Sequence, residues 1–309
     1  MDAKRATLKD VAAAAGVSRA LAGFVLGDDH GKSIPESTRE GVREAARNLG
    51  YVPHGIARAL REGTSRVVVL SIDPGLESSY SRTFACGLDE ELSAHGHMLL
   101  VRQGHSAPVP DRQILDTISP RAVIRLPGNY LVAGRELDDG GWEGGFASNV
   151  LVQVRYLAGR GHVRIAMAFP DGDPPLVPIR ARFTREAAAR TGIPEPSALA
   201  VPQSRSDAAE AVRKFRARHQ KVTAVAAHDD DVALRVLAAM RALGLAAPTD
   251  LAVIGFGDAE YGALVDPALT TVHVDAEEHG RRAAREVLGL DPGALAPFKP
   301  GKVIVRESA

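Results

Sequence analysis

The strongest constraint on the fold is an alternation of strand-like and helix-like segments that begins at Arg66 and continues to the end of the chain. Val67–Ile72 is an unbroken β-branched and aliphatic run, typical of a strand buried on both faces of a parallel sheet. Further strands are predicted near 97–101, 121–126, 163–168, 198–201, 222–227, 251–255 and 302–306, and helices near 80–94, 148–160, 178–191, 206–219, 230–243 and 276–289. This rhythm predicts an α/β fold with a doubly wound parallel sheet, in which ligands bind at the carboxyl ends of the strands.

The first 65 residues have a different pattern, which predicts three short helices. Thr7 and Asp10 have the spacing of an N-terminal capping box, and Ser18 can cap a second helix. We expect a third helix with Pro35 at its first helical position. The tight joint at residues 15–18 has the spacing of a helix-turn-helix, although a generic helical hairpin is the alternative.

Composition limits the classes of function. The chain has 38 Lys and Arg against 38 Asp and Glu, and its first 65 residues hold 10 against 8, a weak basic excess. With Cys86 as the only cysteine, no internal disulfide and no cysteine-based metal cluster can form. No HExxH, P-loop, GxSxG or well-placed GxGxxG motif occurs, so we expect no enzyme activity, no cofactor and no metal. No signal peptide or membrane span is predicted, so we expect a cytoplasmic protein without a membrane partner.

Several ordered segments resemble one family. Thr7-Leu8-Lys9-Asp10-Val11-Ala12, followed by Ala15-Gly16-Val17-Ser18, is similar to the headpiece of the LacI/GalR (lactose-repressor) family. Later matches follow in the family's order over most of the chain, at 37–39, 49–53, 57–60, 160–166, 228–230, 248–256 and 266–272.

The resemblance implies an architecture and a function. It implies a helix-turn-helix headpiece at 1–52, a hinge helix at 53–65 and an effector-binding and dimerisation domain at 66–309. That domain is expected to be two-lobed and periplasmic-binding-protein-like, with lobe one at about 66–161 and 275–290 and lobe two at about 162–272 and 291–309. Such proteins bind a pseudo-palindromic DNA operator as homodimers, usually as repressors, under the control of a small, sugar-like ligand. A cytoplasmic solute-binding protein and a regulator that has lost ligand sensing are the alternatives.

The resemblance also assigns DNA-binding residues. The second helix is expected in the major groove, where Arg19 could bind guanine through two hydrogen bonds and Ala20 could contact a thymine methyl group. Leu60 matches a leucine that wedges into the minor groove. The family's Thr-Val-Ser-Arg is replaced by Leu21-Ala22-Gly23-Phe24, which should weaken phosphate contacts. The full set is Thr7, Leu8, Ser18, Arg19, Ala20, Leu21, Ser33, Thr38, Tyr51, His54, Ile56, Ala57 and Leu60.

Each of these assignments has a structural alternative. Thr7 and Ser18 could serve only as helix caps, Thr38 and Tyr51 could lie at the core edge, and Arg19 could be a solvated side chain. Residues 53–65 could be a plain linker.

Effector-binding residues follow in the same way. Tyr80 matches a pocket aromatic that can stack on a sugar ring, and Asp230 matches a carboxylate that accepts two hydroxyl hydrogen bonds. Asp230 could instead cap a helix together with its acidic neighbours. The complete set is Tyr80, Ser81, Asn149, Arg180, Arg182 and Asp230, with Arg180 and Arg182 as alternatives for one role.

One segment departs from the family. Between Leu126 and Gly161 the chain is shorter than the family pattern by roughly 20 residues. Only Pro127-Gly128-Asn129 separates Leu126 from the apolar run at 130–133, which is too short for the crossover of about a dozen residues that parallel strands need. We therefore expect a crossover helix to be missing there, with residues 130–135 forming an irregular extension or an antiparallel edge. The hypothesis that follows is a remodelled pocket that does not bind an ordinary sugar.

Overall fold

The computed structural model describes residues 6–27, 34–51, 65–73, 76–103, 118–126, 145–172, 174, 176–291 and 300–309. The chain divides into two compact units, one formed by Met1–Val67 and Val109–Arg121 and the other by Val68–Pro108 and Ala122–Ala309. Within the described ranges, no helix combines the length and the apolar character needed to cross a membrane.

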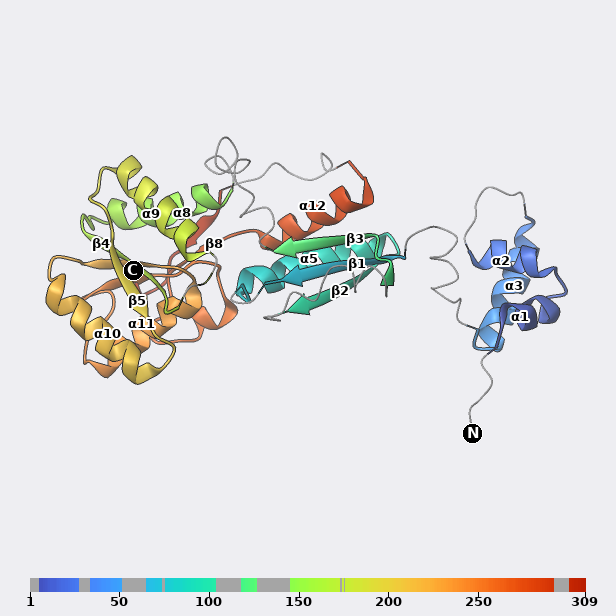
Figure 1. The fold of residues 1–309 in the computed structure, drawn as a ribbon, viewed down its shortest axis with the longest axis horizontal. Coiled ribbons are helices and arrows are strands. Elements are labelled where there is room, and N and C mark those ends of the chain that lie inside the picture. The colour runs from blue at the N-terminus through green and yellow to red at the C-terminus, as the bar shows by residue number, and fades with distance from the viewer. Residues whose placement is uncertain are drawn as a thin grey trace. The chain divides into compact units, whose positions relative to one another are not determined.

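Within its described residues, the first unit contains three helices, drawn in blue in Figure 1: α1 (Leu8–Ala14), α2 (Arg19–Leu26) and α3 (Glu36–Asn48). The Thr7–Asp10 capping box is present, which confirms that prediction. Pro35 is the residue before the helix rather than its first helical residue, because its backbone is extended, with ψ at 138°. The helices enclose a small core of Val11, Ala12, Ala22, Val25, Val42 and Ala46.

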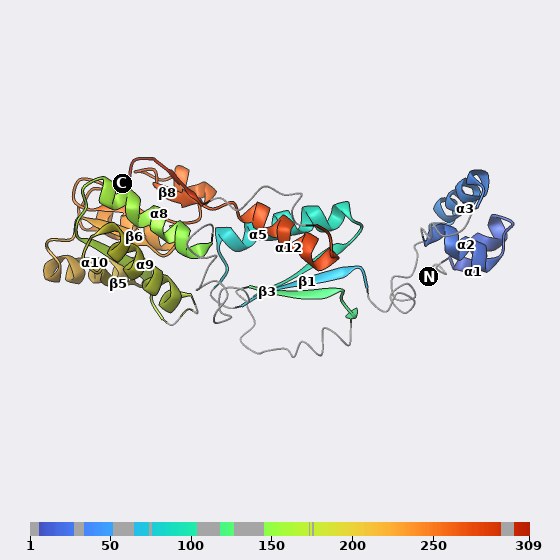
Figure 2. The same ribbon diagram turned by 90° about the horizontal axis from the view of Figure 1, so that it is seen from above.

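The second unit has two lobes. In the first lobe, β1 (Val67–Ile72), β2 (Met98–Gln103) and β3 (Ala122–Leu126) form a sheet of order β2-β1-β3, in which β1 and β3 are parallel. The helices α5 (Ser79–Ala94) and α12 (Ala276–Leu288) pack against each other beside this sheet (Figure 2). Their approach requires glycine, because a Cβ at Gly280 would lie 2.1 Å from the carbonyl oxygen of Phe84.

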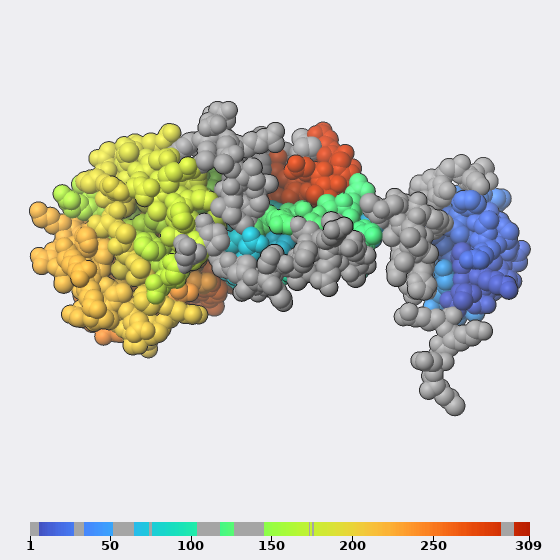
Figure 3. All heavy atoms as spheres, in the orientation of Figure 1, coloured from blue at the N-terminus to red at the C-terminus, as the bar shows by residue number. Residues whose placement is uncertain are grey.

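The second lobe is a four-stranded parallel sheet of order β5-β4-β6-β7. Its strands are β4 (Ile165–Pro170), β5 (Ser197–Val201), β6 (Ala224–Ala227) and β7 (Ala252–Ile254), and its helices are α8 (Phe146–Gly159), α9 (Val177–Thr191), α10 (Arg205–Arg218) and α11 (Asp230–Ala242). Alternate strand residues face opposite sides, so Ile165 packs toward α8 and α9 whereas Ala166 packs toward α10 and α11. In the space-filling view this yellow and orange lobe is one closely packed body (Figure 3).

The remaining short elements bring the end of the chain into the second lobe. A 3₁₀ helix, η2 (Glu260–Ala263), follows β7, and β8 (Thr271–His273) pairs antiparallel with β9 (Lys302–Ile304). Beyond β9, Ser308 accepts a hydrogen bond from Val253 through its carbonyl oxygen. These contacts join the C-terminus to β7.

The structure differs from the expected lobe boundary at α8. The sequence predicted that the first lobe extends to residue 161, but Val150, Val154 and Leu157 on α8 belong to the same core as Ile165 and Ile254. The helix therefore packs on the second sheet, whose apolar face would otherwise lie open. The segment expected to lack its crossover, 127–144, lies outside the described residues, so that hypothesis stays a prediction.

Candidate functional site

The first turn of α2 is exposed on the surface of the helical unit. The Ser18 hydroxyl accepts a hydrogen bond from the Leu21 amide at 3.1 Å, which caps the helix. Ser18, Arg19 and Ala20 are all exposed, whereas Ala22 and Val25 on the opposite face are buried in the core. The helix thus directs its first turn outward, which is the geometry that a helix in a major groove requires.

Other predicted DNA-binding residues also have roles in the fold. The Thr7 hydroxyl donates to Asp10 at 2.7 Å as part of the capping box. Leu8 and Tyr51 are half-buried and pack against the core of this unit, and Thr38 is half-buried on α3. Ser33, His54, Ile56, Ala57 and Leu60 lie outside the described residues, so their roles stay predictions.

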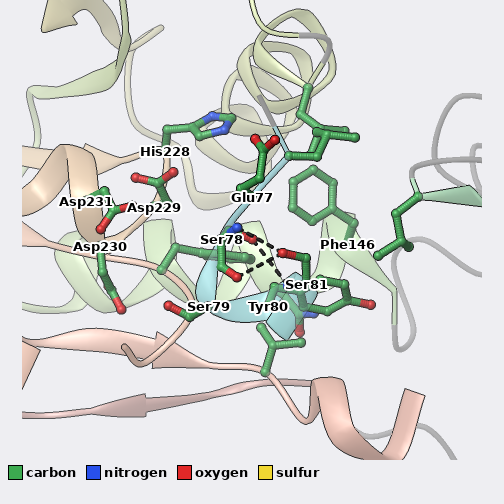
Figure 4. Close-up of a pocket in the computed structure, with 17 residues that line it drawn as sticks. Glu77, Ser78, Ser79, Tyr80, Ser81, Phe146, His228, Asp229, Asp230 and Asp231 are labelled. Atoms are coloured by element: carbon green, nitrogen blue, oxygen red, sulfur yellow. Dashed lines mark hydrogen bonds between the residues drawn. The ribbon is translucent and has the colours of Figure 1, made fainter. Parts of the chain in front are cut away.

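A cavity of about 110 Å³ lies in the second unit, at the carboxyl ends of β3, β6 and β7 (Figure 4). This is the end of a parallel sheet where ligands usually bind. The wall combines serine hydroxyls, carboxylates, one imidazole and three aromatic rings. The lining residues are Leu76, Glu77, Ser78, Ser79, Tyr80, Ser81, Leu126, Phe146, Asn149, Leu176, His228, Asp229, Asp230, Asp231, Phe256, Gly257 and Val274.

Four of the predicted effector residues line this cavity, but their polar atoms also bond within the protein. The Tyr80 hydroxyl is 3.0 Å from Nδ1 of His279 on α12. The Ser81 hydroxyl donates to the carbonyl oxygen of Ser78 at 2.9 Å, and the side-chain oxygen of Asn149 accepts from the Gly301 amide at 2.7 Å. These residues support the wall that they form.

Both carboxylate oxygens of Asp230 accept hydrogen bonds from within the protein. One carboxylate oxygen accepts from the Ala259 amide at 2.5 Å, and the other accepts from the Thr271 hydroxyl at 2.6 Å. The side chain is buried, and that burial raises its pKa, against the opposing effect of the Thr271 hydrogen bond. Asp230 therefore fixes the loop after β7 to β8. The cap of α11 is Asp229, whose side chain accepts from the Val232 amide at 2.8 Å.

The two candidate arginines lie in different surroundings. Arg182 lies outside the cavity, within 3.7 Å of Glu186. Arg180 is fully buried, with its guanidinium 3.9 Å from the ring centre of Phe256, and it donates to Gln153 at 2.8 Å. Its Nε and Nη1 have no hydrogen-bond partner among the described residues, and burial lowers its pKa to about 9. Arg180 supports the aromatic wall from behind and does not line the cavity.

Sequence reasoning missed several wall residues. His228 lines the cavity with Nδ1 unpaired in the described part of the chain, and burial, followed by the charge of Arg180, lowers its pKa to about 3. Asp229 lies beside it, and burial raises its pKa to about 6. The matched triplet 228–230 was a signal for both, although the prediction singled out only Asp230. Glu77 and Phe146 had no recognisable signal. No cluster of side chains suited to a metal ion occurs within the described ranges.

Comparison with known proteins agrees with this architecture. Residues 7–54 match the family of bacterial regulatory proteins of the lacI type, and residues 154–309 match the periplasmic binding protein-like domain. The transcriptional repressor CytR of Escherichia coli K12 is 27% identical over 330 residues, covering 98% of this chain and 96% of CytR. The ribose operon repressor of the same strain is 25% identical over 304 residues, covering 90% and 91%.

Solved structures share the fold. A lac repressor dimer bound to operator and an anti-inducer aligns with a TM-score of 0.77 at 19% identity, covering 99% of both chains. The regulator CelR in complex with cellobiose aligns with a TM-score of 0.63 at 24% identity, covering 99% of this chain and all of CelR. With a lacI-type helix-turn-helix followed by a periplasmic binding protein-like domain, the chain belongs to the LacI family of bacterial regulatory proteins.

Proposed function

We propose that this protein is a transcriptional repressor that binds a pseudo-palindromic operator as a homodimer and responds to a small ligand. The observation that carries the proposal is the capped, exposed start of α2, where Ser18, Arg19 and Ala20 lie on the surface of a helix-turn-helix. Because its partner is DNA, we place its action in the cytoplasm.

Arg19 is the residue that we assign to base recognition. It is exposed at the first position of α2, and arginine pairs with guanine through two hydrogen bonds, a contact worth about 1–3 kcal/mol of discrimination. Thr7, Ser18, Thr38 and Tyr51 are proposed to hold DNA phosphates, and Ala20 is proposed to contact a thymine methyl group. Leu8 and Leu21 complete the proposed DNA-binding set in this unit. Gly23 and Phe24 offer no charge or hydroxyl to the DNA, so we infer that backbone anchoring is weak.

Dimerisation and the hinge complete the proposal. The lac repressor that shares this fold binds its operator as a dimer. We propose a headpiece at 1–52 and a hinge at 53–65, in which paired copies of Leu60 widen the minor groove between the half-sites. Short helices are marginal alone in water, so folding of the hinge would depend on DNA and on the second copy.

The cavity between β3, β6 and β7 is proposed to be the sensing site. The related CelR structure holds cellobiose, and a ligand of this general kind could reach the serine and carboxylate oxygens of the wall here. Ligand binding changes the affinity for DNA if the protein has two conformations that differ both in ligand affinity and in DNA affinity. The relatives are regulators, and we propose that this protein likewise binds its ligand without converting it.

Fluorescence anisotropy with DNA from upstream of the protein's own gene tests the proposal. We expect saturable binding that competitor DNA of unrelated sequence does not abolish, and a strong loss in Arg19→Ala. Arg213→Ala, an exposed arginine paired with Glu210 on α10, is the matched control and should bind like the wild type. Equal affinity of the wild-type protein for upstream and unrelated DNA would contradict the assignment.

A further inference from the structure

One side of the sensing cavity is crowded with acidic groups. In Figure 4 the side chains of Glu77, Asp229 and Asp231 lie near His228, while Asp230 points the other way. Asp231 also accepts a hydrogen bond from the Tyr261 hydroxyl. Among the described lining residues there is no lysine and no arginine.

His228 adds a separate indication that this side binds a ligand. Its side chain is half-buried on the cavity wall, and its buried Nδ1 has no hydrogen-bond partner among the described residues. An unpaired buried polar atom is costly unless something else satisfies it. A neutral imidazole has one donating and one accepting nitrogen, so His228 can bond to either a hydroxyl or an amine.

Three aromatic side chains, those of Tyr80, Phe146 and Phe256, form part of the same wall. The Tyr80 ring is stacked on Phe84, with 6.1 Å between ring centres, and its hydroxyl is tied to His279, so its orientation is fixed. Phe256 already has one cation, Arg180, 3.9 Å from its ring centre. Aromatic faces attract ammonium groups as well as guanidinium groups. The wall thus pairs carboxylates with rings, both of which favour a cation.

Desolvation decides between neutral and charged ligands. A neutral ligand that covers ionised carboxylates removes water from them and returns only hydrogen bonds, whereas a cation also compensates their charge. Burial, followed by the charges of Asp231 and Asp230, raises the pKa of Asp229 against the opposing effects of the Val232 amide and the charge of Arg235. An anion would be repelled.

We propose that the ligand is a small hydroxylated compound, about the size of one sugar ring, that carries a protonated amine. This inference rests on the proposed function of the cavity as the sensing site. The amine lies among Glu77, Asp229 and Asp231, a hydroxyl reaches His228, and the ring lies against the aromatic side chains.

Isothermal titration calorimetry of the full chain at pH 7.5 tests the ligand class with matched compounds. The cationic probes are glucosamine, galactosamine and mannosamine. The neutral probes are their three parent sugars, and the anionic probes are the 6-phosphates of those parent sugars. We expect at least one amine to bind at least tenfold more tightly than its neutral parent, and no phosphate to bind. A neutral sugar that binds as tightly as its amine, a phosphate that binds, or the failure of all three amines to bind would overturn the proposal.

Two variants locate the interaction. Asp229→Asn removes the charge but keeps the helix cap, because asparagine caps as well as aspartate. It should lose at least tenfold in amine affinity, and Glu77→Gln serves if that variant fails to fold. Asp207→Asn on α10, whose side chain is remote from the cavity, is the control and should bind amines like the wild type. An unchanged amine affinity in both pocket variants would contradict the site.

The titration with upstream DNA distinguishes failure of this ligand inference from failure of the proposed function. If the wild-type protein binds its upstream DNA specifically but shows no preference for amines, only this inference fails. If it has no specific affinity for DNA, the proposed function fails, whatever the calorimetry shows.

Discussion

The start of α2 and the wall of the cavity use polar side chains in opposite ways. On α2, Arg19 is exposed and the Ser18 hydroxyl makes a single cap. In the cavity, Asp230, Asn149 and Ser81 all bond within the protein. We infer that recognition and folding can be separated by mutation at Arg19, whereas in the cavity the same residues shape the site and stabilise it.

The largest expected effect tests whether the cavity residues stabilise the fold. Asp230→Ala should lower the free energy of unfolding of the second unit by about 3 kcal/mol, because the buried Ala259 amide and Thr271 hydroxyl lose their acceptor. Chemical denaturation followed by circular dichroism measures this, with the exposed Asp207→Ala as control. A loss below about 1 kcal/mol would show that the loop after β7 is held by other contacts.

The next largest effect tests whether Arg19 acts in DNA recognition without contributing to folding. Arg19→Ala should weaken binding to the preferred DNA by 10- to 100-fold, which corresponds to about 1–3 kcal/mol, and leave the unfolding transition unchanged. Arg19→Lys keeps the charge but loses the two-point contact, so it should lose specificity while retaining most affinity for unrelated DNA. Both quantities come from one anisotropy series. A destabilised Arg19→Ala would mean that the start of α2 is not separable from the fold.

A smaller effect concerns pH. The lowered pKa of His228, about 3, means that the unfolded chain binds the extra proton between pH 3 and 6.5, so this group destabilises the fold as pH falls. The raised pKa of Asp229, about 6, has the opposite sign, since the folded state holds the proton between pH 3.8 and 6. The two effects oppose each other in the wild-type protein.

A variant that lacks one of these two titrating groups should show the pH dependence of the other. Between pH 6 and 5, Asp229→Asn should lose about 1 kcal/mol of stability relative to the wild type, and His228→Gln should gain a similar amount. Urea unfolding at both pH values measures this. If the two variants shift in the same direction, the assigned pKa directions are wrong.

The smallest expected effect is the loss of a helix cap, which can be compared at two positions. Ser18→Ala and Ser204→Ala each remove a hydroxyl that accepts from a backbone amide, of Leu21 and Asp207 respectively, and each should cost about 1 kcal/mol. Only Ser18→Ala should also weaken DNA binding. Hydrogen exchange of α2 and α10 reports the stability, and equal DNA affinities in the two variants would contradict the role of the α2 start.

What could be predicted from the sequence follows the same division. The Thr7–Asp10 box, the Ser18 cap and the strand at Val67–Ile72 depend on neighbours within a few residues, so their local pattern was sufficient. The cavity depends on contacts over long distances along the chain. The Gly301 amide that engages Asn149 is one example, and no local pattern indicated it.

The same reason explains the differences. The two arginine candidates on α9, two positions apart, looked alike in the sequence, but only packing against Phe256 distinguishes the buried Arg180 from Arg182. The lobe to which α8 belongs was likewise set by the apolar surface that it covers, including Ile165 and Ile254. Periodicity identifies such a helix without indicating its partner.

Selection of fragmented genomic DNA by the purified full chain shows whether α2 reads a DNA sequence. We expect enrichment of fragments that share two inverted half-sites, and loss of that enrichment in Arg19→Ala. Fragments recovered in proportion to their abundance, with no shared half-site, would rule out sequence recognition by α2.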